Sequence, residues 1–174
     1  MDFYPPRKLI EMKHLALTLA LLVLCLFVKS QSLSLADLQF VCKKNSWESV
    51  NQYLINRGWE YYDSEKETPE KYGAISWSYN KSYNGKAEGW LHLLISEEVP
   101  SKVTYLMFNQ PAYLKIQNAV GRYGYKSTGS EIDDDEITST YSSSSYMLEI
   151  ATLKRDNVTH FAFAISTLVM KHFS

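Results

Sequence analysis

The chain has 174 residues and a formal net charge of −1, and 45% of its residues are hydrophobic. This length suits one domain that buries a core of its own. The charge argues against a nucleic-acid partner, because contact with phosphates requires a concentrated basic surface.

The N-terminal segment 1–30 predicts a signal peptide. Three basic residues precede an apolar run at 15–28, which is shorter than the roughly 20 residues that a membrane-spanning helix needs. Val28 and Ser30 then precede a cleavage site before Gln31 at the two positions where small side chains are preferred. We therefore expect an exported protein, periplasmic, secreted or held in the cell envelope, with no transmembrane helix in the mature chain.

Two alternatives concern the same segment. Met12 is a second candidate start, because the sequence that follows it is a complete signal peptide by itself. Cys25 would carry a lipid if cleavage fell just before it, although Leu24 stands where a small side chain is expected. Residues 31–174 keep Cys42 as their one cysteine, so an intramolecular disulfide is excluded and packing must stabilise the fold unaided.

Two short helices are predicted next. Ser34 and Asp37 have the spacing of a capping box, which marks a helix start. The apolar face of this helix is formed by Leu35, Leu38, Val41 and Cys42. Asn45 and Glu48 can cap the second helix, which Gly58 ends. The buried stripe expected of that helix consists of Trp47, Val50 and Leu54.

Alternating apolar and polar residues then predict four strands, and the Asn84-Gly85 pair predicts a tight turn between the second and the third. These strands are expected near 59–64, 74–80, 87–96 and 102–109. Pro111 can begin a further helix that stops before Gly124. Four more strands are expected after that glycine, near 125–131, 137–142, 146–153 and 160–169.

The chain therefore contains one pattern twice. At one constant shift along the sequence, Gly58 matches Gly124 and Trp59 matches Tyr125. The same shift aligns the apolar helix positions Trp47 with Tyr113, Val50 with Ile116 and Leu54 with Val120. We predict a single α+β domain of two pseudo-repeats, about 31–109 and 110–174, each a helical segment followed by an antiparallel meander. The helices are expected to pack on one face of a sheet of about eight strands.

This order of elements resembles the tandem helix-plus-four-strand architecture of beta-lactamase-inhibitor-protein-like domains, whose sheets present a concave face. The resemblance covers most of residues 31–174 and implies a fold alone, since the paired cysteines of that family are missing here. Inhibition of a lactamase is therefore not implied. The whole chain is also similar to the small exported proteins of gut Bacteroidota, a resemblance that implies no activity.

Residue types that carry catalysis or hold metals are sparse. His92, His160 and His172 have no second histidine or cysteine at metal-ligand spacing, which argues against a zinc site. Cys42 lies on the apolar face of the first helix, where a thiol is an inert packing group. The acidic run 131–137 lacks the glycine-kinked loop of a calcium site and is interpreted as a solvated hairpin loop. We predict no catalytic residue, no metal and no cofactor.

Aromatic residues are the better candidates for function, since the sequence contains 13 Tyr and 4 Trp. Tyr and Trp offer a large contact area at low entropic cost and are common at contacts with proteins and sugars. Five candidate positions alternate on three consecutive predicted strands: Trp77, Tyr79, Trp90, His92 and Tyr105. We expect them to form a ligand-binding surface for a protein or glycan partner on the open face of the sheet.

Other interpretations of these residues stay open. The rings would be ordinary core and cross-strand pairs if the strands bury them. A hydrolase with a site built from Glu65, His92 or their neighbours would make the protein an enzyme, and a structural protein of the envelope would need no site. An exposed, contiguous aromatic patch favours binding, whereas a cleft that gathers carboxylates and His92 favours the enzyme.

Export predicts a defined N-terminus. Mass spectrometry of the secreted or periplasmic protein should find a chain that begins at Gln31 or within a few residues of it, because the small residue before that position suits signal-peptide cleavage. An intact N-terminus in the membrane fraction would contradict export. A lipid on Cys25 would support the lipoprotein alternative instead.

Overall fold

The computed structural model describes residues 32–44, 46–68, 71–96, 101–155 and 157–168. These residues belong to one unit, Ser32–Ser174. The predicted signal peptide with its cleavage site before Gln31, the second start at Met12 and the candidate lipid site at Cys25 all lie outside the described residues.

Eight strands of the described chain form one antiparallel sheet in the order β1-β2-β3-β4-β8-β7-β6-β5. The first four are β1 (Trp59–Glu65), β2 (Gly73–Tyr79), β3 (Gly89–Ile95) and β4 (Lys102–Met107). The others are β5 (Lys126–Asp133), β6 (Glu136–Ser142), β7 (Tyr146–Arg155) and β8 (Val158–Thr167). The predicted α+β class and the predicted eight strands are confirmed.

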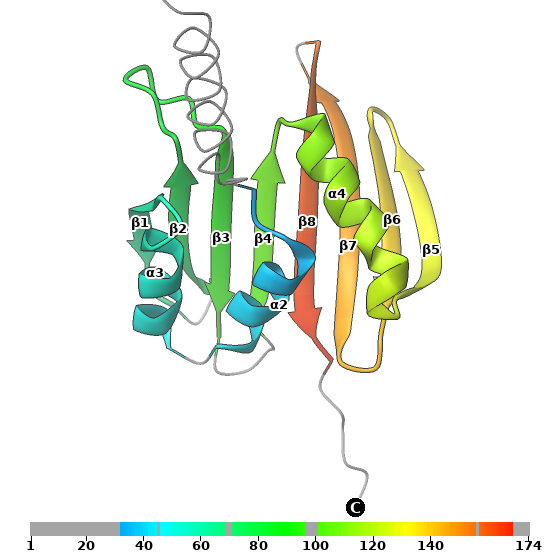
Figure 1. Ribbon diagram of the computed structural model, residues 1–174, viewed down its shortest axis with the longest axis horizontal. Helices are drawn as coiled ribbons and strands as arrows, with labels where there is room; N and C mark the ends of the chain where they lie inside the picture. Colours follow the sequence, from blue (N-terminus) through cyan, green and yellow to red (C-terminus); the bar gives the residue numbers. More distant parts are fainter. Residues whose placement is uncertain (1–31, 45, 69–70, 97–100, 156, 169–174) are drawn as a thin grey trace, which may run out of the picture. The chain divides into compact units, whose positions relative to one another are not determined.

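The two groups of four strands meet where β4 pairs with β8, at the centre of the sheet (Figure 1). Tyr105 pairs with Phe163 there, so residues far apart in the sequence become direct neighbours. β1 and β5, the first strand of each group, form the two edges. A glycine with a left-handed backbone precedes each edge strand, Gly58 at φ 81° and Gly124 at φ 75°, as is typical after a helix.

Three α-helices of the described chain lie in front of the sheet in Figure 1: α2 (Leu35–Lys43), α3 (Trp47–Ile55) and α4 (Gln110–Val120). A short 3-10 helix at Gly121–Tyr123 continues α4. Asn109 caps α4, and Pro111 lies in its first turn as predicted. The cap of α3 is Ser46, and the predicted cap at Asn45 lies outside the described residues.

The predicted capping box of α2 is present and is part of a larger network. The Asp37 carboxylate accepts hydrogen bonds from the backbone N–H and the hydroxyl of Ser34, at 2.7 and 2.6 Å, and another from the Tyr53 hydroxyl of α3. Arg57 lies 3.7 Å from the same carboxylate. Burial alone would raise the pKa of Asp37, but these hydrogen bonds and the Arg57 charge outweigh it and lower the pKa. The network therefore joins α2 to α3.

The core lies between the helices and the sheet, because one cluster of buried side chains contains residues from α2, α3, α4 and the strands. Trp77 of β2 is fully buried in this cluster, and its indole N–H donates to Oδ1 of Asn51 on α3 at 2.9 Å. Tyr113 of α4 stacks on Phe161 of β8, with ring centroids 4.3 Å apart. Aromatic side chains thus connect the helices with both the outer and the central strands.

The predicted burial of Trp47 is wrong. Val50 and Leu54 of the same helical stripe are buried, but Trp47 is 45% exposed. The reason is the position of the helix: α3 lies over the outer strands β1 and β2, whereas α4 begins over the central strand β8 (Figure 1). Tyr113 of α4 therefore stacks on Phe161, whereas the ring of Trp47 lines a cavity.

Two tryptophans should respond differently to truncation. Trp77→Ala is expected to lower the free energy of unfolding by about 3–5 kcal/mol, because it removes a fully buried ring and leaves Asn51 without its partner. Trp47→Ala should cost clearly less than Trp77→Ala, because nearly half of the residue is already exposed. Urea unfolding of both variants tests this, and equal losses would contradict the positions of the two rings.

Candidate functional site

The strand registers determine which side chains share a face of the sheet. Trp77 pairs with Leu91, and Ser78 pairs with Trp90. Because successive side chains of a strand point to opposite faces, Trp77 points into the core and Trp90 points away from it. We call the face that carries Trp90 the open face. Its central positions are Ser76, Trp90, His92, Thr104, Leu106, Ala162, Ala164, Glu149 and Ala151.

The predicted binding surface is divided between the two faces. Trp77, Tyr79 and Tyr105 point into the core and are buried, as the alternative interpretation expects. Burial also raises the pKa of Tyr105 to about 12. Trp90 and His92 lie on the open face and are partly exposed. The expectation that all five residues share one open face is therefore wrong, and two of them remain as candidates.

Trp90 is surrounded by other rings on the open face. Tyr62 meets it edge to face, with ring centroids 4.9 Å apart and an interplanar angle of 80°. His92 lies nearly parallel to Trp90 at 6.4 Å, and Nζ of Lys81 lies 4.3 Å from the centre of the Tyr62 ring. Tyr62 is the unpaired residue of a bulge in β1. Strict strand alternation assumes no bulge, so it does not predict this neighbour of Trp90.

A second pair of rings lies on the same face. Phe108, which follows β4, meets His160 of β8 edge to face at 5.0 Å. Both residues and Trp90 line a cavity of about 650 Å³. We call Tyr62, Trp90, His92, Phe108 and His160 the aromatic cluster. The contact between Phe108 and His160 depends on the pairing of β4 with β8, which the sequence does not reveal. The one signal in the sequence is the position of His160 at the start of a predicted strand.

Alanine and threonine occupy part of the open face beside the aromatic cluster. Ala162 and Ala164 of β8 pair with Leu106 and Thr104 of β4. Ala151 of β7 continues the same row beyond β8. Because alanine and threonine extend little above the backbone, a flat group can approach the sheet here while its edge touches the longer rings. The arrangement suits binding by stacking and shape.

His92 forms a cross-strand hydrogen bond. Its Nδ1 lies 2.8 Å from the hydroxyl oxygen of Ser76, its direct partner in the β2–β3 ladder. Burial lowers the pKa of His92, which favours the neutral ring at pH 7. No carboxylate of the described residues bonds to the other ring nitrogen, as a Ser-His-Asp arrangement requires. The pair therefore connects two strands and is not arranged as nucleophile and base.

The other chemically active side chains of the described chain do not converge. Glu65, the partner of His92 in the hydrolase interpretation, forms an ion pair with Lys71. No group of three His, Cys, Asp or Glu among the described residues is placed to hold a metal ion. Cys42 is buried, and burial raises the pKa of its thiol to about 11. The acidic run covers the end of β5, the exposed turn at Asp134 and Asp135 and the start of β6, with Asp134 at φ 44°.

Among the described residues, no helix has the length and apolar character to cross a membrane. The chain matches no protein-family model, no curated protein and no solved structure. The aromatic cluster must therefore be interpreted from its own geometry and chemistry.

The burial of His92 predicts a pH dependence of stability. An NMR titration should give His92 a pKa below its usual value of 6.5. The unfolded chain then binds the proton more readily than the folded one, so the stabilisation by neutral His92 is complete above pH 6.5 and is lost as the pH falls toward the folded pKa. His92→Gln should make the free energy of unfolding depend less on pH below pH 6.5. A pKa at or above 6.5 would contradict the burial of the ring.

Proposed function

We propose that this protein is a non-enzymatic binding domain that holds a protein or glycan partner on the open face of its sheet, through the aromatic cluster. The observation that carries the proposal is the cavity of about 650 Å³ lined by Trp90, Phe108 and His160. Its volume lies in the range of about 300–1,000 Å³ that is usual for ligand sites. A sugar ring or a side chain of a partner protein would fill it.

The chemistry around these rings suits such a partner. Aromatic faces bind the apolar faces of sugars and the side chains of proteins, while neighbouring polar groups orient them. Lys86, Glu88 and Arg155 line the same cavity and provide donors and acceptors of hydrogen bonds. Because charges of both signs surround the rings, we propose a partner without a strong net charge at the point of contact.

The proposal extends to the origin of the fold. We infer that 31–109 and 110–174 are two copies of one helix-plus-meander unit, and that the helices of both copies pack on one face and leave the other for a partner. The symmetrical strand order and the left-handed Gly58 and Gly124 support this inference. The likeness to beta-lactamase-inhibitor-protein-like domains concerns architecture alone. We further propose export to the periplasm, the envelope or the medium, where an external partner is accessible.

Truncating the central rings should weaken binding without unfolding the protein. A glycan array and a panel of purified exported proteins, probed with the labelled protein, would identify the partner. Trp90→Ala and Phe108→Ala are expected to raise the dissociation constant at least about tenfold, because each removes a ring that lines the cavity. The unfolding midpoints should stay close to that of the wild type, since both rings are partly exposed.

Ile132→Ala is the matched control. Ile132 is 75% exposed on the hairpin of β5 and β6, at the opposite edge of the sheet from Tyr62, and its truncation should leave affinity unchanged. If Trp90→Ala and Phe108→Ala bind as tightly as this control, the aromatic cluster is not the site. The same conclusion follows if they lose binding only because they unfold.

A further inference from the structure

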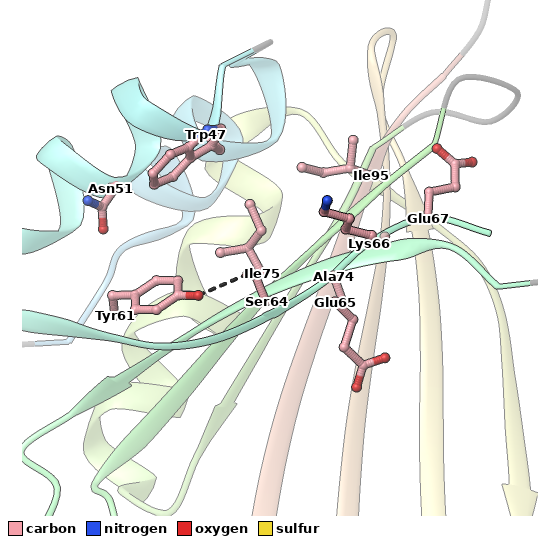
Figure 2. Close-up of a pocket in the computed structure, with 11 residues that line it drawn as sticks. Trp47, Asn51, Tyr61, Ser64, Glu65, Lys66, Glu67, Ala74, Ile75 and Ile95 are labelled. Atoms are coloured by element: carbon pink, nitrogen blue, oxygen red, sulfur yellow. Dashed lines mark hydrogen bonds between the residues drawn. The ribbon is translucent and has the colours of Figure 1, made fainter.

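A second cavity, of about 540 Å³, lies on the helix side of the sheet. Figure 2 shows Trp47 and Asn51 of α3 on one side of it and Tyr61 of β1 with Ile75 of β2 on another. Ile95, at the end of β3, also lines it. The aromatic cluster lies on the open face, so this cavity is separate from the site proposed above.

Several side chains in the walls of this second cavity are apolar and only partly buried. Trp47 is 45% exposed, Tyr61 48% and Ile95 36%. These side chains line the cavity together with Ile75 and do not close on one another. Its volume lies in the range of about 300–1,000 Å³ that is typical of small-molecule sites. An aromatic or aliphatic group placed between them would remove their apolar surface from water.

The neutral polar groups at this cavity are available as donors. Oδ1 of Asn51 accepts from the Trp77 indole at 2.9 Å, which orients the amide and leaves its NH₂ group to donate. The Tyr61 hydroxyl donates to Oγ of Ser64 at 2.9 Å, so the Ser64 hydroxyl proton is directed elsewhere. A ligand that accepts hydrogen bonds would match both groups.

Lys66 adds a positive charge to these donors. In Figure 2 its amine is on the cavity side near Ile95, whereas the Glu65 carboxylate points to the other side of the strand. Glu65 already pairs with Lys71. None of the ion pairs between described residues involves Lys66. Glu67 also lines the cavity, but its carboxylate lies beyond Ile95 (Figure 2).

We infer that this cavity binds a small monocarboxylic acid with an aromatic or aliphatic body. The carboxylate pairs with Lys66, and the body lies between the ring of Trp47 and the side chains of Ile75 and Ile95. One ammonium group suits a monoanion, whereas a phosphate is usually held by several cationic or backbone donors. The inference does not rest on the proposed function of the open face.

The test follows the indole N–H signal of Trp47 by NMR in the full-length protein, with the signal assigned from its loss in Trp47→Phe. Indole-3-acetate and octanoate are the probes, and tryptamine and octylamine are their counterparts with the charge reversed. Either acid should shift the Trp47 signal saturably with a dissociation constant below about 1 mM. The amine of the same body should bind at least about tenfold more weakly, because it meets Lys66 with a like charge.

Lys66→Met should weaken binding of the acid about tenfold and narrow the gap between acid and amine. Lys126→Met is the matched control, since Lys126 begins β5 at the opposite edge of the sheet from β1, and it should leave binding unchanged. Unfolding midpoints of both variants would show that the fold is retained. Absence of a saturable shift with either acid, equal affinity for acid and amine, or equal effects of the two lysine variants would overturn the inference, whatever the aromatic cluster binds.

Discussion

The antiparallel pairing of β4 with β8 is the contact on which the rest of the structure depends. Without it, two four-strand meanders would each expose an unpaired edge and bury only part of the core. The ladder places Tyr105 opposite Phe163 and Leu106 opposite Ala162, so it determines the core side and the open face together. These partners are far apart in the sequence, and closing the chain between them costs conformational entropy that the shared core must offset.

Local sequence patterns predict the elements well because each element is defined by near neighbours in the chain. The capping box at Ser34 and the helix end at Gly58, whose backbone is left-handed, each depend on residues a few positions apart. Both are present as predicted. A face of the sheet is different, since it depends on register. Trp77 pairs with Leu91 and not with Trp90, and this difference of one residue puts the two tryptophans on opposite faces.

The parts of the candidate site that sequence reasoning misses share one cause, which is dependence on contacts between distant elements. Tyr62 contacts Trp90 because a bulge in β1 turns its side chain to the open face. Phe108 contacts His160 because β4 pairs with β8. Trp47 is misjudged for a related reason. Helical periodicity indicates the side to which its ring points, but whether strands or a cavity lie beneath it depends on how far α3 stands from the centre of the sheet.

The core also explains why both candidate sites lie where they do. Under the proposed tandem origin, Tyr113 and Trp47 come from equivalent helices, yet Tyr113 is stacked on Phe161 and Trp47 lines a cavity. A substitution at the surface usually changes the free energy of unfolding by less than about 0.5 kcal/mol. Side chains there can therefore change with little effect on folding. The open face and the outer edge beneath α3 are therefore the regions where this fold can acquire binding surfaces, because their side chains lie outside the buried core.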